Sequence, residues 1–211
     1  MQIDIGILGT GRMGVRLARM FAEAGRNVLL GSRDPERGAA VAPELRSGRI
    51  VPGSYGDALA APAVLPAIFI RDGLFELLEP FRASLAGKLL IDISNPFNED
   101  YSDFITPWDT SGAEELARQV PEARIVGAFK NVYWAVFDEP LFTGSPSDVF
   151  VIGDDAGAKD EFFRLTADTP FRYLDAGPLI NARTIERMTM ITGALGRRIG
   201  AYPRMNWKLL G

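Results

Sequence analysis

The chain has 211 residues, of which 47% are apolar and 24% are charged, a composition typical of a globular protein with one large α/β domain. The net charge of −4 and the lack of any Lys/Arg cluster argue against a nucleic-acid partner. Cysteine and histidine are both absent, which excludes disulfides, thiolate–metal sites and Ser-His-Asp catalysis and makes a reducing cytoplasm the expected compartment.

The first predicted unit is a buried strand, a glycine-rich turn and a helix. Residues 3–8 lead directly into three glycines with the spacing G-x-G-x-x-G, and a helix is predicted from Arg12 to Ala24. This spacing is the fingerprint for the diphosphate of a dinucleotide, which binds at the N–H groups of the helix N-terminus. The predicted cofactor-binding residues of this turn are Gly9, Thr10, Gly11, Arg12, Met13 and Gly14.

The second predicted strand, Asn27 to Gly31, is followed by Ser32 and Arg33. Sites specific for NAD place an Asp or Glu here to bind the ribose hydroxyls. A hydroxyl and a guanidinium bind a 2′-phosphate instead, and one hydrogen bond to a charged group contributes roughly 1.5–3 kcal/mol. Ser32, Arg33 and Arg37, the last one helical turn further on, therefore predict a site selective for NADP.

Strands and helices continue to alternate as far as residue 93. Proline cannot donate to a β-ladder, so Pro66 predicts a bulge or an early bend in its strand. Ligands of doubly wound sheets bind at the carboxyl ends of the strands, which makes Arg71 and residues 94–96 candidate site residues. The predicted elements are strands Arg49–Pro52, Ala63–Ile70 and Lys88–Ile93 and helices Gly53–Ala61 and Leu74–Leu85.

Residues 98–112 are polar and rich in turn residues, which predicts a loop long enough to form a lid or a partner contact. Asp154 and Asp155 are predicted to form a turn and cap the following helix, and no metal site is predicted. A long helix from Gly177 to about Ile199 precedes an aromatic tail. The other predicted elements are helices Ala113–Val120 and Ala156–Ala167 and strands Arg124–Phe129, Val149–Gly153 and Phe171–Asp175.

This alternation predicts an α/β fold of the Rossmann type, doubly wound, with a mostly parallel sheet and a small C-terminal helical extension. Residues 1–211 are expected to form a single NADP-binding domain, with its core in residues 1–145 and the last strands, long helix and tail in residues 146–211. No N-terminal targeting segment is expected, and the purest apolar run, Ala63 to Ile70, is too short to span a membrane.

Several motifs together carry a resemblance to a known family. They are Gly9–Gly14, Gly31–Arg33, Ile91–Pro96, Ile125–Asn131, Val149–Asp155, Asp175–Leu179 and Asn181–Arg183. With these motifs the chain resembles the NADP oxidoreductases that use the deazaflavin coenzyme F420, and also the cytosolic oxidoreductase domain of the six-transmembrane metalloreductases. The deazaflavin enzymes often carry a histidine after strand six and the metalloreductases one after strand four, where this chain has Lys130 and Ile70.

The resemblance implies roles for particular residues. Ser32 and Arg33 would bind the 2′-phosphate of NADP, and the C-terminal tail with Trp207 would close over a second cofactor. The ends of strands four, five and six would line the cleft for the nicotinamide and the second cofactor. The residues implied there are Ile70, Arg71, Asn95, Pro96 and Asn131.

The expected activity is hydride transfer between NADP(H) and a deazaflavin or flavin-type ring. Such a transfer needs positioning more than proton transfer, so no catalytic side chain is predicted. One alternative is an NADPH-dependent flavin or ferric reductase, and another is a non-catalytic NADP-binding protein. A dehydrogenase acting on a small ketone or imine would need a proton donor, for which Lys130 and Tyr133 are candidates, although Lys130 also fits a solvated strand end. The 98–112 loop and Trp207 fit equally well as contacts of a homodimer.

Overall fold

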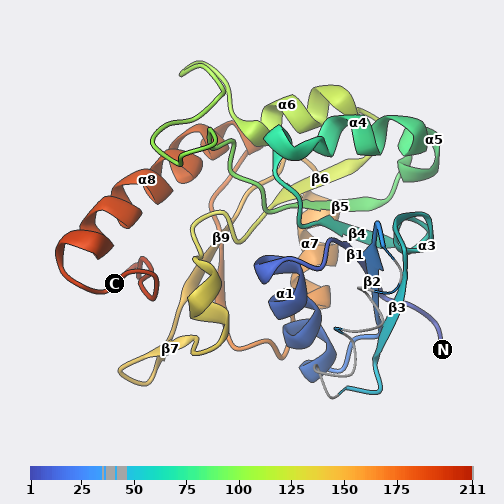
Figure 1. Ribbon diagram of the computed structural model, residues 1–211, viewed down its shortest axis with the longest axis horizontal. Helices are drawn as coiled ribbons and strands as arrows, with labels where there is room; N and C mark the ends of the chain where they lie inside the picture. The colour runs from blue at the N-terminus through green and yellow to red at the C-terminus, as the bar shows by residue number, and fades with distance from the viewer. Residues whose placement is uncertain (35, 37–40, 42–46, 211) are drawn as a thin grey trace.

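The computed structural model describes residues 1–34, 36, 41 and 47–210, and its centre is a six-stranded parallel sheet (Figure 1). The strands are β1 (Ile5–Leu8), β2 (Val28–Ser32), β3 (Ile50–Ser54), β4 (Ala63–Pro66), β5 (Leu89–Asp92) and β6 (Arg124–Gly127). Their order is β3-β2-β1-β4-β5-β6, and every neighbouring pair is parallel. This order changes direction between β1 and β4, as in doubly wound dinucleotide-binding folds, and it confirms the predicted fold class.

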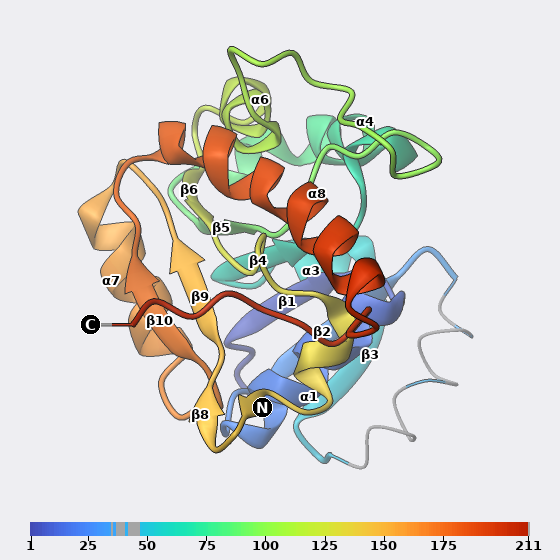
Figure 2. The ribbon, with the colours of Figure 1, turned by 90° about the vertical axis from the view of Figure 1, so that its left-hand side faces the viewer.

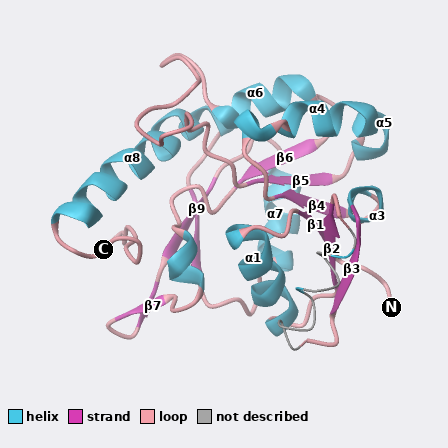
Figure 3. Ribbon diagram, in the orientation of Figure 1, coloured by secondary structure: helices cyan, strands magenta, loops and turns pink. Residues whose placement is uncertain are grey.

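Helices cover both faces of this sheet (Figure 3). They are α1 (Arg12–Glu23), α3 (Tyr55–Leu59), α4 (Leu74–Leu78), α5 (Arg82–Leu85), α6 (Gly112–Gln119), α7 (Ala156–Leu165) and α8 (Ala182–Arg198). On one face, Phe21 of α1 and Phe162 of α7 are buried in an apolar cluster with Ile7. On the other, Leu116 of α6 is buried with Leu8 and with residues of α3, α4, α5 and α8. No helix in the described part of the chain has both the length and the apolar character needed to cross a bilayer.

The structure corrects the prediction of one continuous helix from Leu74 to Leu85. The chain instead forms α4, a 3-10 turn over Glu79–Phe81 and then α5. Pro80 lies in the turn between them. Its missing N–H and its ring are incompatible with an uninterrupted α-helix, so the helix divides there.

Strand β4 ends at Pro66 rather than at Ile70, as the expected early bend requires. It pairs with β1 over its whole length but with β5 only at Ala63 and Val64. Beyond the proline, the Ala67 amide still donates to the Leu8 carbonyl at 2.8 Å before the chain turns away. The early end places residues 67–72 at the carboxyl edge of the sheet.

The C-terminal strands do not extend the main sheet. They are β9 (Asp148–Val151) and β10 (Arg172–Asp175), preceded by a hairpin of β7 (Leu141–Phe142) and β8 (Ser145–Pro146). β9 and β10 form a separate parallel pair, which meets β6 through an antiparallel bridge between Gly127 and Ile152. Figure 2 shows α8 crossing in front of the sheet and the tail running back past β9. The division of the domain into a core of residues 1–145 and a C-terminal part of residues 146–211 stays a prediction.

Candidate functional site

A cavity of about 1040 Å³ opens at the carboxyl ends of the central strands. Residues that follow β1, β2, β4, β5 and β6 line it, and α8 and the tail complete the wall. Ligand pockets usually measure about 300–1,000 Å³, so this cavity has room for more than one ring system. The predicted site residues that line it are Gly9, Thr10, Gly11, Arg12, Met13, Ser32, Arg33 and Asn95.

The glycine-rich turn has the geometry of a diphosphate site. Gly9 has φ +114°, a conformation that side chains disfavour, and a Cβ on Gly14 would lie 1.9 Å from the Gly9 carbonyl oxygen. A Cβ on Gly11 would meet nothing within 4 Å, because this glycine faces the open cavity. Gly11 is also the N-cap of α1, and no side chain caps that helix. The first amides of α1 are therefore available to an anion.

The predicted 2′-phosphate residues lie at the next strand end. Ser32 is the last residue of β2, and its hydroxyl accepts from the Asp34 amide at 3.2 Å. Arg33 is exposed and lines the cavity beside it. The Asp34 carboxylate accepts from the Glu36 amide at 3.0 Å. Arg37, the third predicted residue, lies outside the described residues.

The other five predicted residues, Gly14, Ile70, Arg71, Pro96 and Asn131, do not line the cavity. Asn131 donates to the Asp148 carbonyl at 2.8 Å and accepts from the Phe150 amide at 3.2 Å. Its amide thus joins the loop after β6 to β9. Asn95, in contrast, lines the cavity while donating to the Lys130 carbonyl at 2.8 Å.

Arg71 supports a loop. Its Nη1 donates to the carbonyls of Phe97 and Asn98 at 3.0 and 2.5 Å, and its guanidinium carbon lies 4.2 Å from the ring centroid of Phe69 and 4.4 Å from that of Tyr101. Phe97 and Phe104 close the same loop through a β-bridge. These contacts fix residues 97–104 as a compact turn over the cavity.

Tyr101 lies in this turn and lines the cavity with a left-handed backbone, φ +61°. A bulky residue rarely adopts this conformation, which costs of order 1 kcal/mol or more and persists only where surrounding contacts enforce it. The Tyr101 ring packs edge-on to Phe69, with 5.9 Å between ring centroids. Through Tyr101, the first part of the predicted 98–112 loop supplies one aromatic wall of the cavity.

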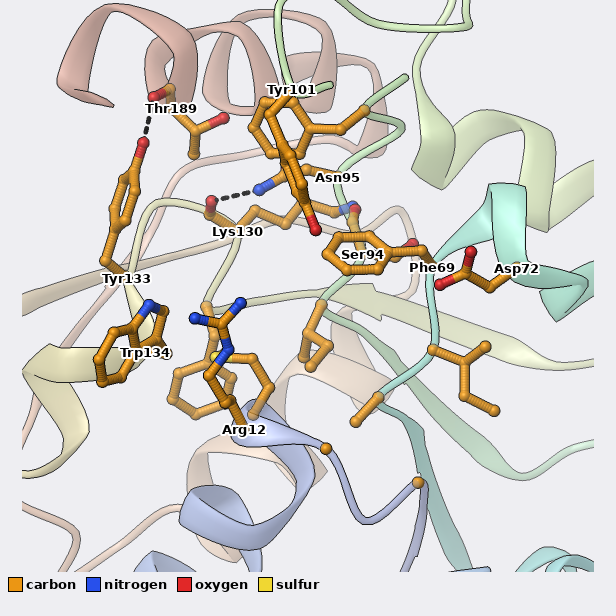
Figure 4. Close-up of a pocket in the computed structure, with 18 of the residues that line it drawn as sticks. Arg12, Phe69, Asp72, Ser94, Asn95, Tyr101, Lys130, Tyr133, Trp134 and Thr189 are labelled. Carbon is orange, nitrogen blue, oxygen red and sulfur yellow. Dashed lines mark hydrogen bonds between the residues drawn. The ribbon is translucent and has the colours of Figure 1, made fainter. Parts of the chain in front are cut away.

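A second aromatic wall faces the first one. Figure 4 shows Tyr133 and Trp134 on one side of the cavity, Phe69 and Asp72 on the other and Arg12 between them. The Tyr133 hydroxyl donates to the Thr189 carbonyl of α8 at 2.7 Å. Burial raises the pKa of Tyr133 to about 12. This phenol is thus bonded and a poor acid.

Lys130 is buried, so its interpretation as a solvated strand end is wrong. Its side chain is 1% exposed and its ammonium lies 2.6 Å from the Asp92 carboxylate and 2.9 Å from that of Glu186. It also donates to the Ser94 carbonyl at 2.5 Å. Burial alone would lower the Lys130 pKa, but the two carboxylates raise it above its ordinary value. The raised pKa makes the Lys130 ammonium a weaker proton donor, and its ion pairs hold it against the two carboxylates.

Sequence reasoning missed both acidic partners of Lys130. Glu186 lies in α8, 56 residues away, and also accepts from the amides of Gly112 and Ala113 at the start of α6. Burial raises the pKa of Glu186, while Lys130 and the Gly112 amide act in the opposite direction. The only signal in the sequence was that Glu186 is the single acidic residue of the amphipathic helix α8. One acidic residue does not indicate whether its side chain faces the protein interior or the solvent.

The C-terminal tail contributes Tyr202 to the cavity, whereas Trp207 does not line it. The Trp207 indole donates to the Thr192 hydroxyl on α8 at 2.6 Å. Further along the tail, Lys208 and the Leu209 amide bind the buried Asp148 carboxylate, which Arg172 also holds. The tail is thus held against α8 and β9 by these polar contacts, and the Trp207 hydrogen bond is one of them.

Asp155 is the N-cap of α7, as expected, because its carboxylate accepts from the Ala158 amide at 2.9 Å. Asp154 instead accepts from the Leu179 amide at 2.9 Å. Within the described residues, no group of three or more acidic side chains is placed to hold a metal ion.

The chain is similar to known proteins over most of its length. A family model described as NADP oxidoreductase coenzyme F420-dependent matches residues 4–96. An F420-dependent NADP reductase of Methanothermobacter thermautotrophicus is 30% identical over 206 residues, which cover 90% of this chain and 87% of that protein. The chain belongs to the coenzyme F420-dependent NADP oxidoreductase family.

Two further proteins are similar to this chain. A solved structure from Arthrobacter sp. FB24, described as a candidate F420-dependent NADP reductase, superposes with a TM-score of 0.88 at 26% identity and covers 99% of this chain and 100% of that one. Metalloreductase STEAP3 of Rattus norvegicus is 30% identical over 187 residues, or 88% of this chain. The chain spans only 36% of that metalloreductase. The family is one of NADP-dependent oxidoreductases.

Proposed function

We propose that the protein transfers hydride between NADP(H) and a deazaflavin or flavin-type ring bound in the same cavity. The observation that carries the proposal is the extent of this cavity, which includes Ser32 and Arg33 after β2 and Tyr133 and Trp134 after β6. These strand ends are four strand spacings apart, roughly 19 Å. NADP fits the first part of this span, and a planar acceptor fits beside the aromatic walls.

Each part of the chain has a defined task in binding NADP. The amides at the start of α1 hold the diphosphate, with Gly11 leaving room for its close approach. Ser32 and Arg33 bind the 2′-phosphate. The nicotinamide then extends toward the ends of β4, β5 and β6, on the opposite side of β1 from β2.

When bound, NADPH supplies a hydride from C4 of its nicotinamide, which leaves NADP⁺ and a reduced acceptor that takes one proton from solvent. The aromatic walls keep the two rings face to face and exclude water between them. The state of Lys130 and Tyr133 supports this reaction over ketone or imine reduction. Both groups are engaged with other parts of the protein, and a ring-to-ring transfer needs neither of them.

The test is NADPH oxidation by the purified protein with a deazaflavin, FMN, FAD and a ferric chelate offered in turn. We expect saturable oxidation with the deazaflavin at a rate far above the reaction without protein. Equal rates with and without protein for every acceptor, despite tight NADPH binding, would favour a non-catalytic NADP-binding protein.

A flavin or ferric reductase is the second candidate, and the similarity to the metalloreductase over 88% of this chain favours it. In that case FMN or FAD is reduced in preference to the deazaflavin, and ferric chelate is reduced only when flavin is present. The same panel of acceptors separates the two candidates.

A further inference from the structure

The buried cluster of Asp92, Lys130 and Glu186 combines two carboxyl groups with one ammonium. Each carboxylate lies within 3 Å of the single ammonium, and the exposed fractions of the three side chains are between 0 and 1%. One ammonium cannot neutralise two carboxylates. Water does not screen the remainder, because the whole cluster is inside the protein.

The hydrogen bonds favour the ionised form of Glu186, against burial and the nearby Asp92 charge, which raise its pKa. Oε1 of Glu186 accepts from Lys130 and the Ala113 amide, and Oε2 accepts from the Gly112 amide. Oδ1 of Asp92 accepts from the amide and the hydroxyl of Ser94 at 2.9 and 2.8 Å. Every one of these contacts is a donor pointing at a carboxylate oxygen. The N-terminus of α6 adds about half a positive charge, so negative charge still remains.

Through Lys130, the cluster adjoins the part of the cavity where the nicotinamide is proposed to bind, and the two acids lie behind this lysine. Ser94 and Lys130 both line the cavity, and so does Thr189, one helical turn after Glu186. Ser94 follows β5 and Lys130 follows β6. Both strand ends lie on the opposite side of β1 from Ser32 and Arg33.

We propose that the Asp92–Lys130–Glu186 cluster stabilises the oxidised nicotinamide over the reduced one and so favours hydride donation from NADPH. The inference rests on the proposed NADP site. NADP⁺ and NADPH differ by one positive charge on the nicotinamide ring, and their remaining contacts with the protein are shared. A buried negative charge nearby therefore tightens the binding of NADP⁺ relative to NADPH, and by linkage it makes the bound NADPH a stronger reductant.

The test measures the dissociation constants of NADP⁺ and NADPH by titration calorimetry, without any acceptor. In the wild type, NADP⁺ should bind more tightly. Glu186→Gln and Asp92→Asn each remove one negative charge and should lower the NADP⁺ preference by about tenfold.

Asp148→Asn is the matched control. Asp148 is also a buried carboxylate held by two cations, but it lies at the start of β9 and contacts no residue of the cluster. Its replacement should leave the NADP⁺ preference unchanged. Thermal unfolding identifies which variants remain folded, and only these are titrated.

Three results are decisive. A wild type that binds NADPH as tightly as NADP⁺ would overturn the proposal without any variant. So would a preference that stays within twofold of the wild type in the folded Glu186→Gln and Asp92→Asn variants. Failure of the wild type to bind either nucleotide would instead overturn the proposed function.

Discussion

The two sides of the cavity are built in different ways. One side comes from residues 5–34, where a strand, a turn and a helix follow one another and the backbone itself forms the diphosphate site. The other side comes from loops after β4, β5 and β6, from α8 and from the tail. Bonds between residues far apart in the chain hold it, such as Tyr133 to Thr189, 56 residues away. The first side depends on local backbone geometry, and the second depends on long-range polar contacts.

Breaking the second side at its centre should have the largest effect. Lys130→Met leaves two buried carboxylates unpaired and should reduce the free energy of unfolding by about 3–5 kcal/mol, as measured by urea denaturation. The matched control is Lys159→Met, whose ion pair with the half-exposed Asp175 is worth at most about 1 kcal/mol. Equal losses for the two variants would show that the buried cluster is not the main support of this side.

On the first side, the effect should fall on binding rather than on stability. Gly11→Ala puts a methyl group into open cavity, so we expect an unchanged melting temperature but NADPH affinity reduced by about thirtyfold or more, roughly 2 kcal/mol. Gly14→Ala is the contrasting variant, because its methyl group meets backbone and should lower stability as well. If Gly11→Ala binds NADPH normally, the diphosphate does not approach this turn.

Arg33→Ala tests whether this first side of the cavity selects NADPH over NADH. Loss of one charged hydrogen bond to the 2′-phosphate should weaken NADPH binding by about ten- to a hundredfold while leaving NADH binding nearly unchanged. Arg198→Ala, which removes an exposed arginine outside the cavity, serves as the control. Equal losses for NADPH and NADH would rule out a role for Arg33 in reading the 2′-phosphate.

A smaller effect is expected at the aromatic wall of the second side. Tyr101→Gly relieves the left-handed backbone conformation while removing the ring, so stability should hold or rise. The KM for the acceptor should rise about three- to tenfold, and the NADPH dissociation constant should stay within twofold. The measurement is steady-state kinetics with each substrate varied in turn. If Tyr101 contacts NADPH instead, NADPH binding should weaken while the KM for the acceptor stays unchanged.

The smallest effect concerns the tail, and it depends on pH. Burial alone would raise the pKa of Asp148, but hydrogen bonds from Arg172, the Leu209 amide and Lys208 hold it below its ordinary value. The stabilisation from Asp148 is therefore complete above its unfolded pKa, about 3.9, and is lost as the pH falls through the lower folded value. In urea denaturation, Asp148→Asn should be less stable than the wild type at pH 6, with the difference shrinking toward pH 3. A constant difference would contradict this assignment.

Short-range features of the fold were predictable from the sequence. The strand ends, the glycine turn and the Asp155 cap depend on residues close together in the chain, and the structure differs there by a few residues. Pro80 shows the limit of periodicity, since the apolar pattern continues across a residue that cannot propagate a helix. The correct prediction of the Asp155 cap and the wrong prediction of a continuous helix across Pro80 both depend on residues close together in the chain.

The sequence by itself determined the doubly wound fold class, the diphosphate turn and the position of Ser32 and Arg33, because alternating strands and helices and their ends follow from local patterns. Only the tertiary structure decided that Lys130 is buried between two acids. It also decided that Arg71 supports a loop and that Trp207 fastens the tail. The physical reason is that a charged or aromatic side chain takes its role from partners dozens of residues away, and spacing along the chain carries no record of those partners.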